Sequence, residues 1–158
     1  MRYRPTALIA VVVALACAPG CRRMPDPGQD RADLEQVFDK YLQSLNGADV
    51  TLASQVWLQS PDVLVVTPSG RLQGWDSVRK DIYMNMQKQM LEPHVEASNI
   101  SIAMAGDAAW LVYDFAFSAK WADGRPFAFK GWESHGYRRT ADGWRIAQLH
   151  YSLRAAPQ

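Results

Sequence analysis

A histidine near the end of the chain and an aspartate further back are the residues best suited to proton chemistry. His150 and Asp114 each lie in a stretch where apolar and polar residues alternate, which is typical of β-strands. An imidazole titrates near neutral pH, and a nearby carboxylate can orient it. In a dry pocket the two can take a proton from a carbon beside a carbonyl group or help to expel a hydroxyl group. We name His150 and Asp114 as candidate catalytic residues; the plainer alternative is a packed histidine that bonds to Ser134.

Glu133 and His135 form a second pair of an acid and an imidazole. They are two residues apart on one predicted strand, so their side chains share a face. In the register that we expect, this face lies opposite that of His150, and the pair sits at a dimer contact or at the rim of the pocket. A register shift of one residue at either neighbouring turn would move the pair to the pocket face. They are therefore the alternative site.

A pocket around these groups would have mostly apolar walls with a few polar anchors, as pockets for small molecules usually do. Trp132 suits the wall, because its neighbours on the same face, Ser134 and Gly136, are small and leave space. The candidate ligand-binding residues are Tyr41, Trp57, Trp110, Trp132, Ser134 and Gln148. These residue types suit a small, largely apolar ligand, although ordinary core packing would also explain the aromatic side chains.

Several other kinds of site are not predicted. The histidines at 94, 135 and 150 lack the spacing of metal ligands, and no cysteine follows position 21. The sequence has no glycine-rich phosphate loop and no serine in a nucleophile turn. Its 17 basic and 16 acidic residues give no electrostatic footprint for nucleic acid. We therefore expect no metal, no cofactor and no nucleic-acid partner.

The first 17 residues have the pattern of an export signal. Arg2 and Arg4 precede an uncharged apolar run, residues 6–16, that is too short to cross a bilayer. The run ends in Val-Ala-Leu-Ala-Cys, which resembles the lipobox of bacterial lipoproteins and makes Cys17 the expected lipid attachment site. Cys21 and secretion without a lipid are the alternatives. We expect a protein of the bacterial cell envelope, lipid-anchored with the outer membrane preferred, or else periplasmic or secreted.

The rest of the chain divides into three parts. Proline and glycine predict a flexible linker before one domain and a short tail, with bounds of 18–29, 30–154 and 155–158. Apolar residues at spacings of three and four predict helices at 30–45, 49–57 and 75–91. Asp30 and Asp49 are the expected N-caps of the first two helices. A run of β-branched residues predicts a covered strand at 63–66.

The second half of the domain alternates with a period of two. Four strands are predicted, at 95–104, 108–121, 127–139 and 144–153. The two Ala-Asp-Gly turns, at 122–124 and 141–143, are expected to be three-residue loops that pair even positions with even positions. The even face, which we take as the pocket face, then carries Trp110, Asp114, Trp132, Ser134, Gln148 and His150. Both faces are too apolar to meet water, so we expect helices on one and a second copy of the chain on the other.

The chain resembles the SnoaL-like, nuclear-transport-factor-2-like (NTF2-like) proteins over nearly the whole domain. The resemblance is carried by residues 46–49, 63–66, 70–74, 106–109, 143–146 and 150–152. It implies an α+β fold in which a cone-shaped, curved antiparallel sheet packs on three N-terminal helices, with a pocket in the cone and dimerisation through the outer sheet face. Many relatives have a histidine where this chain has Gln148 and an arginine where it has Trp132. Both departures remove cations, so anion binding in the manner of those relatives is not expected.

The resemblance does not decide between binding and catalysis, because the family includes ketosteroid isomerase, scytalone dehydratase, polyketide cyclases and pockets with no known chemistry. The leading hypothesis is binding of a small, largely apolar ligand without firm catalytic activity. The first alternative is an isomerase or dehydratase that uses His150 and Asp114. The second is a structural dimerisation domain whose pocket is filled by side chains.

Overall fold

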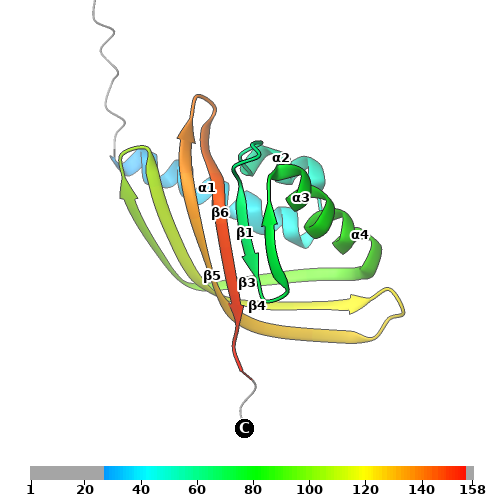
Figure 1. Ribbon diagram of the computed structural model, residues 1–158. Coiled ribbons are helices and arrows are strands. Elements are labelled where there is room, and N and C mark those ends of the chain that lie inside the picture. The colour runs from blue at the N-terminus through cyan, green and yellow to red at the C-terminus, as the bar shows by residue number, and fades with distance from the viewer. Residues whose placement is uncertain (1–26, 156–158) are drawn as a thin grey trace, which may run out of the picture.

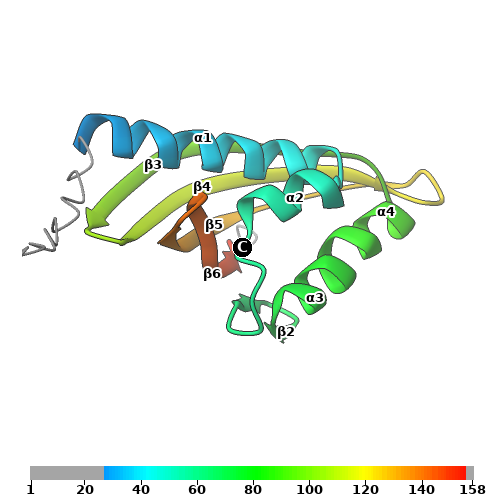
Figure 2. The same cartoon turned by 90° about the horizontal axis from the view of Figure 1, so that it is seen from above.

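The computed structural model describes residues 27–155, which form a curved six-stranded sheet with helices on one side (Figures 1 and 2). The predicted export signal, Cys17 and most of the predicted linker lie outside the described residues. In chain order the elements are α1 (Pro27–Asn46), α2 (Val50–Val56), β1 (Leu64–Thr67), β2 (Gly70–Gln73), α3 (Trp75–Val78), the π-helix η1 (Arg79–Met84), α4 (Asn85–Gln89), β3 (Met90–Ala105), β4 (Ala108–Trp121), β5 (Pro126–Thr140) and β6 (Gly143–Leu153). None of the described helices is long and apolar enough to cross a membrane.

Helix α1 begins earlier than the sequence predicted. It starts at Pro27 rather than at Asp30, because proline fits the first helical position, where its missing N–H is not needed. Asp30 is therefore not the N-cap; its carboxylate accepts a hydrogen bond from Trp144 Nε1 at 2.9 Å and pairs with Arg139. These contacts hold the start of α1 against the far end of the sheet. The buried stripe of α1 is Leu34, Phe38, Tyr41 and Leu45.

The second predicted cap is confirmed, and the third helix is more irregular than expected. Asp49 Oδ1 accepts the N–H of Leu52 at 3.0 Å at the start of α2. The third helix ends at Gln89 rather than at Leu91, and its middle turn, η1, winds as a π-helix. Such segments insert an extra residue per turn and are frequent at functional sites.

The strand order is β2-β1-β6-β5-β4-β3, and all neighbours are antiparallel except β1 and β6, which are parallel. Strand β3 is longer than predicted and starts at Met90, and the short edge strand β2 was not predicted as a strand. The three long strands β3 to β5 run beneath α1 in Figure 2, so that helix covers their inner face.

The register between β4 and β5 agrees with the sequence prediction, and that between β5 and β6 agrees only in part. Even positions pair with even positions from Ala108↔Arg138 to Lys120↔Pro126. The second turn has two residues instead of three, because Thr140 pairs directly with Gly143. A bulge then adds Ala147 to β6 and restores even pairing at Gly136↔Gln148. Strand β6 therefore changes face at Ala147.

The helices cover the face of the sheet opposite to the one predicted to hold the pocket. Odd positions of β4 and β5 such as Leu111, Tyr113 and His135 are buried, whereas the even residues Trp110 and Trp132 are 53% and 45% exposed. The buried face carries the larger apolar and aromatic side chains, so covering it removes more apolar surface from water. The even face is the outer face of the sheet.

Candidate functional site

A cavity of about 390 Å³ lies between the inner face of the sheet and the helices. Its size falls in the range of small-molecule pockets. The sheet contributes mainly aromatic and apolar side chains, and flexible ones come from Met86 on α4 and from Met90 at the start of β3. The aromatic residues that line it are Tyr41, Trp57, Tyr83, Tyr113, Phe115, Phe117, Phe129 and Tyr151. Glu133 is the one acidic residue of the sheet among the described lining residues.

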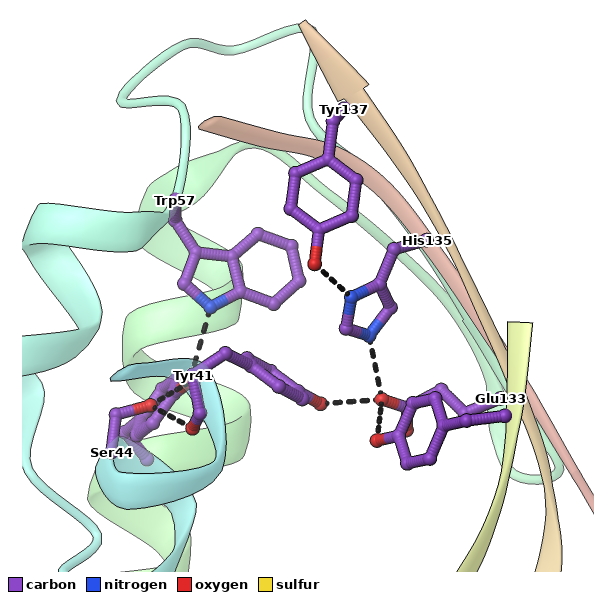
Figure 3. A network of polar contacts seen from close by, with 8 residues as sticks. Tyr41, Ser44, Trp57, Glu133, His135 and Tyr137 are labelled. Atoms are coloured by element: carbon purple, nitrogen blue, oxygen red, sulfur yellow. Dashed lines mark hydrogen bonds and ion pairs between the residues drawn. The ribbon is translucent and has the colours of Figure 1, made fainter. Parts of the chain in front are cut away.

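Glu133 is held by three donors that come from three different elements (Figure 3). Its Oε1 accepts hydrogen bonds from the hydroxyls of Tyr41 on α1 at 2.7 Å and Tyr113 on β4 at 2.6 Å, and lies 2.7 Å from His135 Nε2 on β5. The side chain is only 9% exposed. Three donors on one oxygen favour the charged carboxylate, which would otherwise be costly to bury.

The second carboxylate oxygen of Glu133 has no such partners. Oε2 accepts no hydrogen bond from any described residue, yet it is not fully buried. In residues 27–155 the fully buried side-chain polar atoms without a hydrogen-bond partner are two nitrogens of Arg139, which form ion pairs instead. Glu133 lines the cavity. Oε1 is thus used to fix the side chain, and Oε2 is left accessible to a ligand.

The charge of His135 follows from its two neighbours. Its Nδ1 lies 2.8 Å from the hydroxyl of Tyr137, and that hydroxyl has no other acceptor among the described residues. A buried phenol must donate its proton, so the Tyr137 hydroxyl donates to Nδ1, and Nε2–H donates to Glu133. His135 is then neutral, and the cluster carries the single negative charge of Glu133.

The tyrosines of the cluster remain protonated at neutral pH. Burial raises the pKa of Tyr41 and of Tyr113 well above the ordinary value, and the negative charge of Glu133 raises both further. Burial, followed by the charge of Glu133, also raises the pKa of Tyr137. All three are therefore hydrogen-bond donors, as the geometry around Glu133 requires.

A second group of polar contacts joins the three helices at the other wall of the cavity. The Tyr83 hydroxyl on η1 accepts a hydrogen bond from Trp57 Nε1 at 3.1 Å and lies 2.9 Å from Ser44 Oγ on α1. Burial raises the pKa of Tyr83 to about 12. The π-helical turn of η1 places this tyrosine between α1 and α2, so the helical wall is fixed by side-chain hydrogen bonds.

The structure places both predicted catalytic residues outside the cavity. His150 is exposed on the outer face, where it pairs with Ser134 across β5 and β6. Asp114 is on the same face, and its Oδ2 accepts hydrogen bonds from Arg154 at 2.6 Å and from Asn99 at 3.1 Å. The predicted inward orientation of His150 is therefore wrong. The cause is which face the helices cover: His150 pairs with Ser134, as the predicted register has it, but the helices cover the odd positions of β4 and β5.

The predicted ligand-binding residues separate into two groups. Tyr41 and Trp57 line the cavity. Four others, Trp110, Trp132, Ser134 and Gln148, occupy even positions of the outer face and do not line it. Trp132 and Gln148 stand where many relatives have cations. Because both side chains lie outside the cavity, they do not affect its charge.

The alternative pair is brought together inside the cone and bonds to Tyr113 and Tyr137. Sequence reasoning selected neither of these two tyrosines, nor Tyr83 at the helical wall. Glu133 and His135 are hydrogen-bonded, as their spacing on one face allowed. Tyr113 and Tyr137 occupy odd positions of the same face, so the same alternation could have found them, whereas nothing local marks Tyr83. Among residues 27–155 no group of three His, Cys, Asp or Glu side chains could hold a metal ion.

The comparisons with known proteins agree with the fold. An NTF2-like superfamily protein from Salmonella enterica serovar Typhimurium is 27% identical, covers 84% of this chain and 96% of its own, and has a TM-score of 0.79. The Kfla4162 protein from Kribbella flavida is 16% identical over 82% of this chain and 94% of its own, with a TM-score of 0.73. A type 2 hexachlorocyclohexane dehydrochlorinase (LinA) is 14% identical over 80% and 86%, with a TM-score of 0.70.

No curated protein sequence matches this chain. The SnoaL-like domain matches residues 34–156, from Leu34 within α1 onward through every later element to β6. The chain is therefore a member of the SnoaL-like family and has the NTF2-like fold.

Proposed function

We propose that the cavity binds a small, largely apolar ligand and that Glu133 exchanges a proton with it. The observation that carries this proposal is the position of Glu133: a carboxylate at the end of an apolar cavity, with Oε1 fixed by three donors and Oε2 accessible. Groups that are desolvated and held by specific partners in a cavity are typical of functional sites. General acid–base catalysis needs a group with this kind of fixed geometry and a free atom to receive the proton.

The proposed reaction is of the isomerase or dehydratase type. Oε2 takes a proton from a carbon beside a carbonyl group, and the electron pair of the broken C–H bond moves onto the carbonyl oxygen. Glu133 then returns the proton to another carbon, which is isomerisation. Alternatively, the electron pair forms a C=C bond as a hydroxyl group leaves from the next carbon and takes the proton from Glu133 as water, which is dehydration. His135 is a positioning residue, because it acts on the ligand only through Glu133.

Proton transfer can be measured before the natural ligand is known. In D2O, proton NMR would follow loss of the signal of carbon-bound hydrogens in a panel of small cyclic ketones. We expect exchange above the buffer rate for the wild type and a reduction of about a hundredfold in Glu133→Gln.

His150→Ala is the matched control, because this exposed imidazole lies on the outer face. It should exchange ketones at the wild-type rate. Retention of exchange in Glu133→Gln, or its loss in His150→Ala, would contradict the role given to Glu133. Circular dichroism of both variants would show that the fold is kept.

Binding without turnover is the second candidate, and the same cavity supports it. It predicts that a ketone binds to the wild type while no exchange occurs. The third expectation, a structural domain with a filled pocket, is not supported, because the inner face and the helices leave about 390 Å³ between them.

We further propose that the chain is exported, carries a lipid on Cys17 and forms a homodimer through the outer face of the sheet. The first two points rest on the charged and apolar pattern of residues 1–17 and on the cysteine that ends it. Mass spectrometry of the mature chain tests them: an acylated Cys17 as the first residue is expected, and a chain without lipid would contradict the anchor. The dimer rests on the exposed Trp110, Val112 and Trp132, whose apolar surface is unusual for a monomer.

A further inference from the structure

We infer that the cavity selects ligands that carry one positively charged nitrogen on an apolar body. This inference rests on the proposed function only in using the same cavity as a ligand site. It concerns the charge of the ligand, which neither the fold nor the sheet alternation reveals. Three observations carry it: the charge of Glu133, the placement of the other charged lining residues, and the aromatic walls.

The cavity contains a negative charge that nothing inside it neutralises. The three partners of Glu133 Oε1 are two phenols and an imidazole whose Nδ1 receives the proton of Tyr137, so none of them brings a positive charge. The side chain is more than nine-tenths buried, and Oε2 has no partner among the described residues. A buried carboxylate of this kind attracts a cation more strongly than it would in water.

The other charged lining residues do not reverse this sign. Asp81, on η1, adds a second acid at the cavity. Arg71 is the only cationic residue among the described lining residues. Arg71 pairs with Val66 on β1, and Val66 pairs with the outward-facing His150 on β6. The side chain of Arg71 therefore belongs to the outer face of the sheet. There its guanidinium donates a hydrogen bond to Gln73. Within the cavity the balance is therefore negative.

The walls suit a cation as well as an apolar body. Eight aromatic residues line the cavity, and the five of them on the sheet are all phenylalanine or tyrosine. Phe115 and Phe129 meet edge to face, and Phe117 and Phe129 are stacked with centroids 4.9 Å apart. The faces of aromatic rings attract cations, and aromatic cavities with a nearby acid are a known way to bind ammonium groups. An anion would lose its water here without gaining a positive partner.

A positive nitrogen also fits the proton transfer assigned to Glu133. Positive charge next to a carbon makes its hydrogens more acidic, so a carboxylate can remove them more readily. The charge that anchors the ligand would thus assist the reaction at the neighbouring carbon.

Three probes with one ring system and different charges test the inference. At pH 7, 2-naphthylmethylamine is a cation, 2-naphthalenemethanol is neutral and 2-naphthoate is an anion. Calorimetric titration of the wild type at low salt should show the amine binding about tenfold more tightly than the alcohol, and the naphthoate most weakly. Glu133→Gln should bring the amine within about twofold of the alcohol and leave the alcohol's Kd unchanged within the same factor.

Two further variants control for charge elsewhere. Asp81→Asn should reduce the preference for the amine only in part. Asp76→Asn removes an exposed acid of α3 that does not line the cavity, and it should leave all three Kd values unchanged.

The outcomes separate this inference from the proposed function. If none of the three probes binds, the cavity is not a ligand site, and both proposals fail. If the alcohol binds as tightly as the amine, or if Glu133→Gln keeps the preference, the charge inference alone is overturned. Should Glu133→Gln fail to fold, the order of the probes on the wild type and the effect of Asp81→Asn decide the question.

Discussion

Glu133 is the residue on which the chemistry of the cavity depends, and tyrosines make its burial possible. Removing a carboxylate from water costs on the order of several kcal/mol unless hydrogen bonds replace its hydration. Tyr41 and Tyr113 supply two of these bonds, and His135 supplies the third. The phenols can do so only while they are protonated, and burial ensures this over the whole neutral range by raising their pKa values.

The buried tyrosines predict a loss of stability at alkaline pH. In the unfolded chain they titrate near pH 10, whereas the folded-state pKa of Tyr83 is about 12. Below pH 10 both states are protonated and the stabilisation is complete. Above it the unfolded chain loses protons that the folded chain keeps, so the free energy of unfolding falls by about 1.4 kcal/mol per pH unit for each such tyrosine.

Urea unfolding between pH 8 and pH 11, followed by tyrosinate absorbance, measures this effect. The midpoint should be constant to about pH 9.5 and then fall. Tyr83→Phe should reduce the slope of the free energy of unfolding against pH by about 1.4 kcal/mol per pH unit, which is the contribution of one proton. A midpoint that does not change up to pH 11 would show that these tyrosines ionise as easily in the folded chain as in the unfolded one.

At the level of elements, two close contacts shape the sheet. Beside the bulge at Ala147 the segment that follows α2 docks on β6, where Leu58 N–H donates to the carbonyl of Ile146 at 2.9 Å. The second contact is at Gly131 on β5, where the backbone of β6 and the ring of Phe115 approach so closely that no side chain fits.

Gly131→Ala tests the second contact. An added Cβ would lie 1.9 Å from the carbonyl oxygen of Ser152 and 2.8 Å from the Phe115 ring. Because the first neighbour is backbone, strand β6 must move, and we expect the free energy of unfolding to fall by about 2–4 kcal/mol. Gly136→Ala is the matched control on the same strand: its Cβ would meet the flexible Gln148 side chain at 3.3 Å. It should cost about 1 kcal/mol or less by thermal or urea unfolding, and equal costs for the two variants would contradict the contact.

At the level of the whole molecule, the outer face of the sheet is the surface that remains to be covered. Trp110, Val112 and Trp132 lie together on adjacent strands and are about half exposed. The guanidinium of Arg154 lies over the Trp132 ring at 4.7 Å and pairs with Asp114, so the patch has a charged border. An apolar centre with a polar rim is typical of protein interfaces.

Val112→Glu, at an exposed position whose cross-strand neighbours are Ser101 and Ser134, should therefore separate the proposed dimer. A charge at the centre of an apolar interface would lack a partner, and light scattering after gel filtration should show the mass of one chain instead of two. Leu91→Glu is the control, because Leu91 is similarly exposed but lies at the start of the edge strand β3. It should remain dimeric. A wild type that is monomeric at micromolar concentration would end the proposal.

The sequence by itself determined the α+β class, the order of the helices and of every strand except β2, the Asp49 cap and the pairing of β4 with β5. These features follow from local spacing and turn chemistry, which act over a few residues. Alternation also established that Glu133 and His135 share a face with Tyr113. It could not determine which face is covered, because both faces are apolar enough to need a partner.

Only the tertiary structure decided that the acid lies inside and His150 outside. The helices cover the odd face of β4 and β5, which carries Glu133, and the bulge at Ala147 reverses the alternation of β6, so that Trp144 and Ile146 are buried while His150 is exposed. The hydrogen bond from Tyr41 to Glu133 joins residues 92 positions apart. Such a contact exists because helix and sheet pack against each other, and no pattern within either element specifies it.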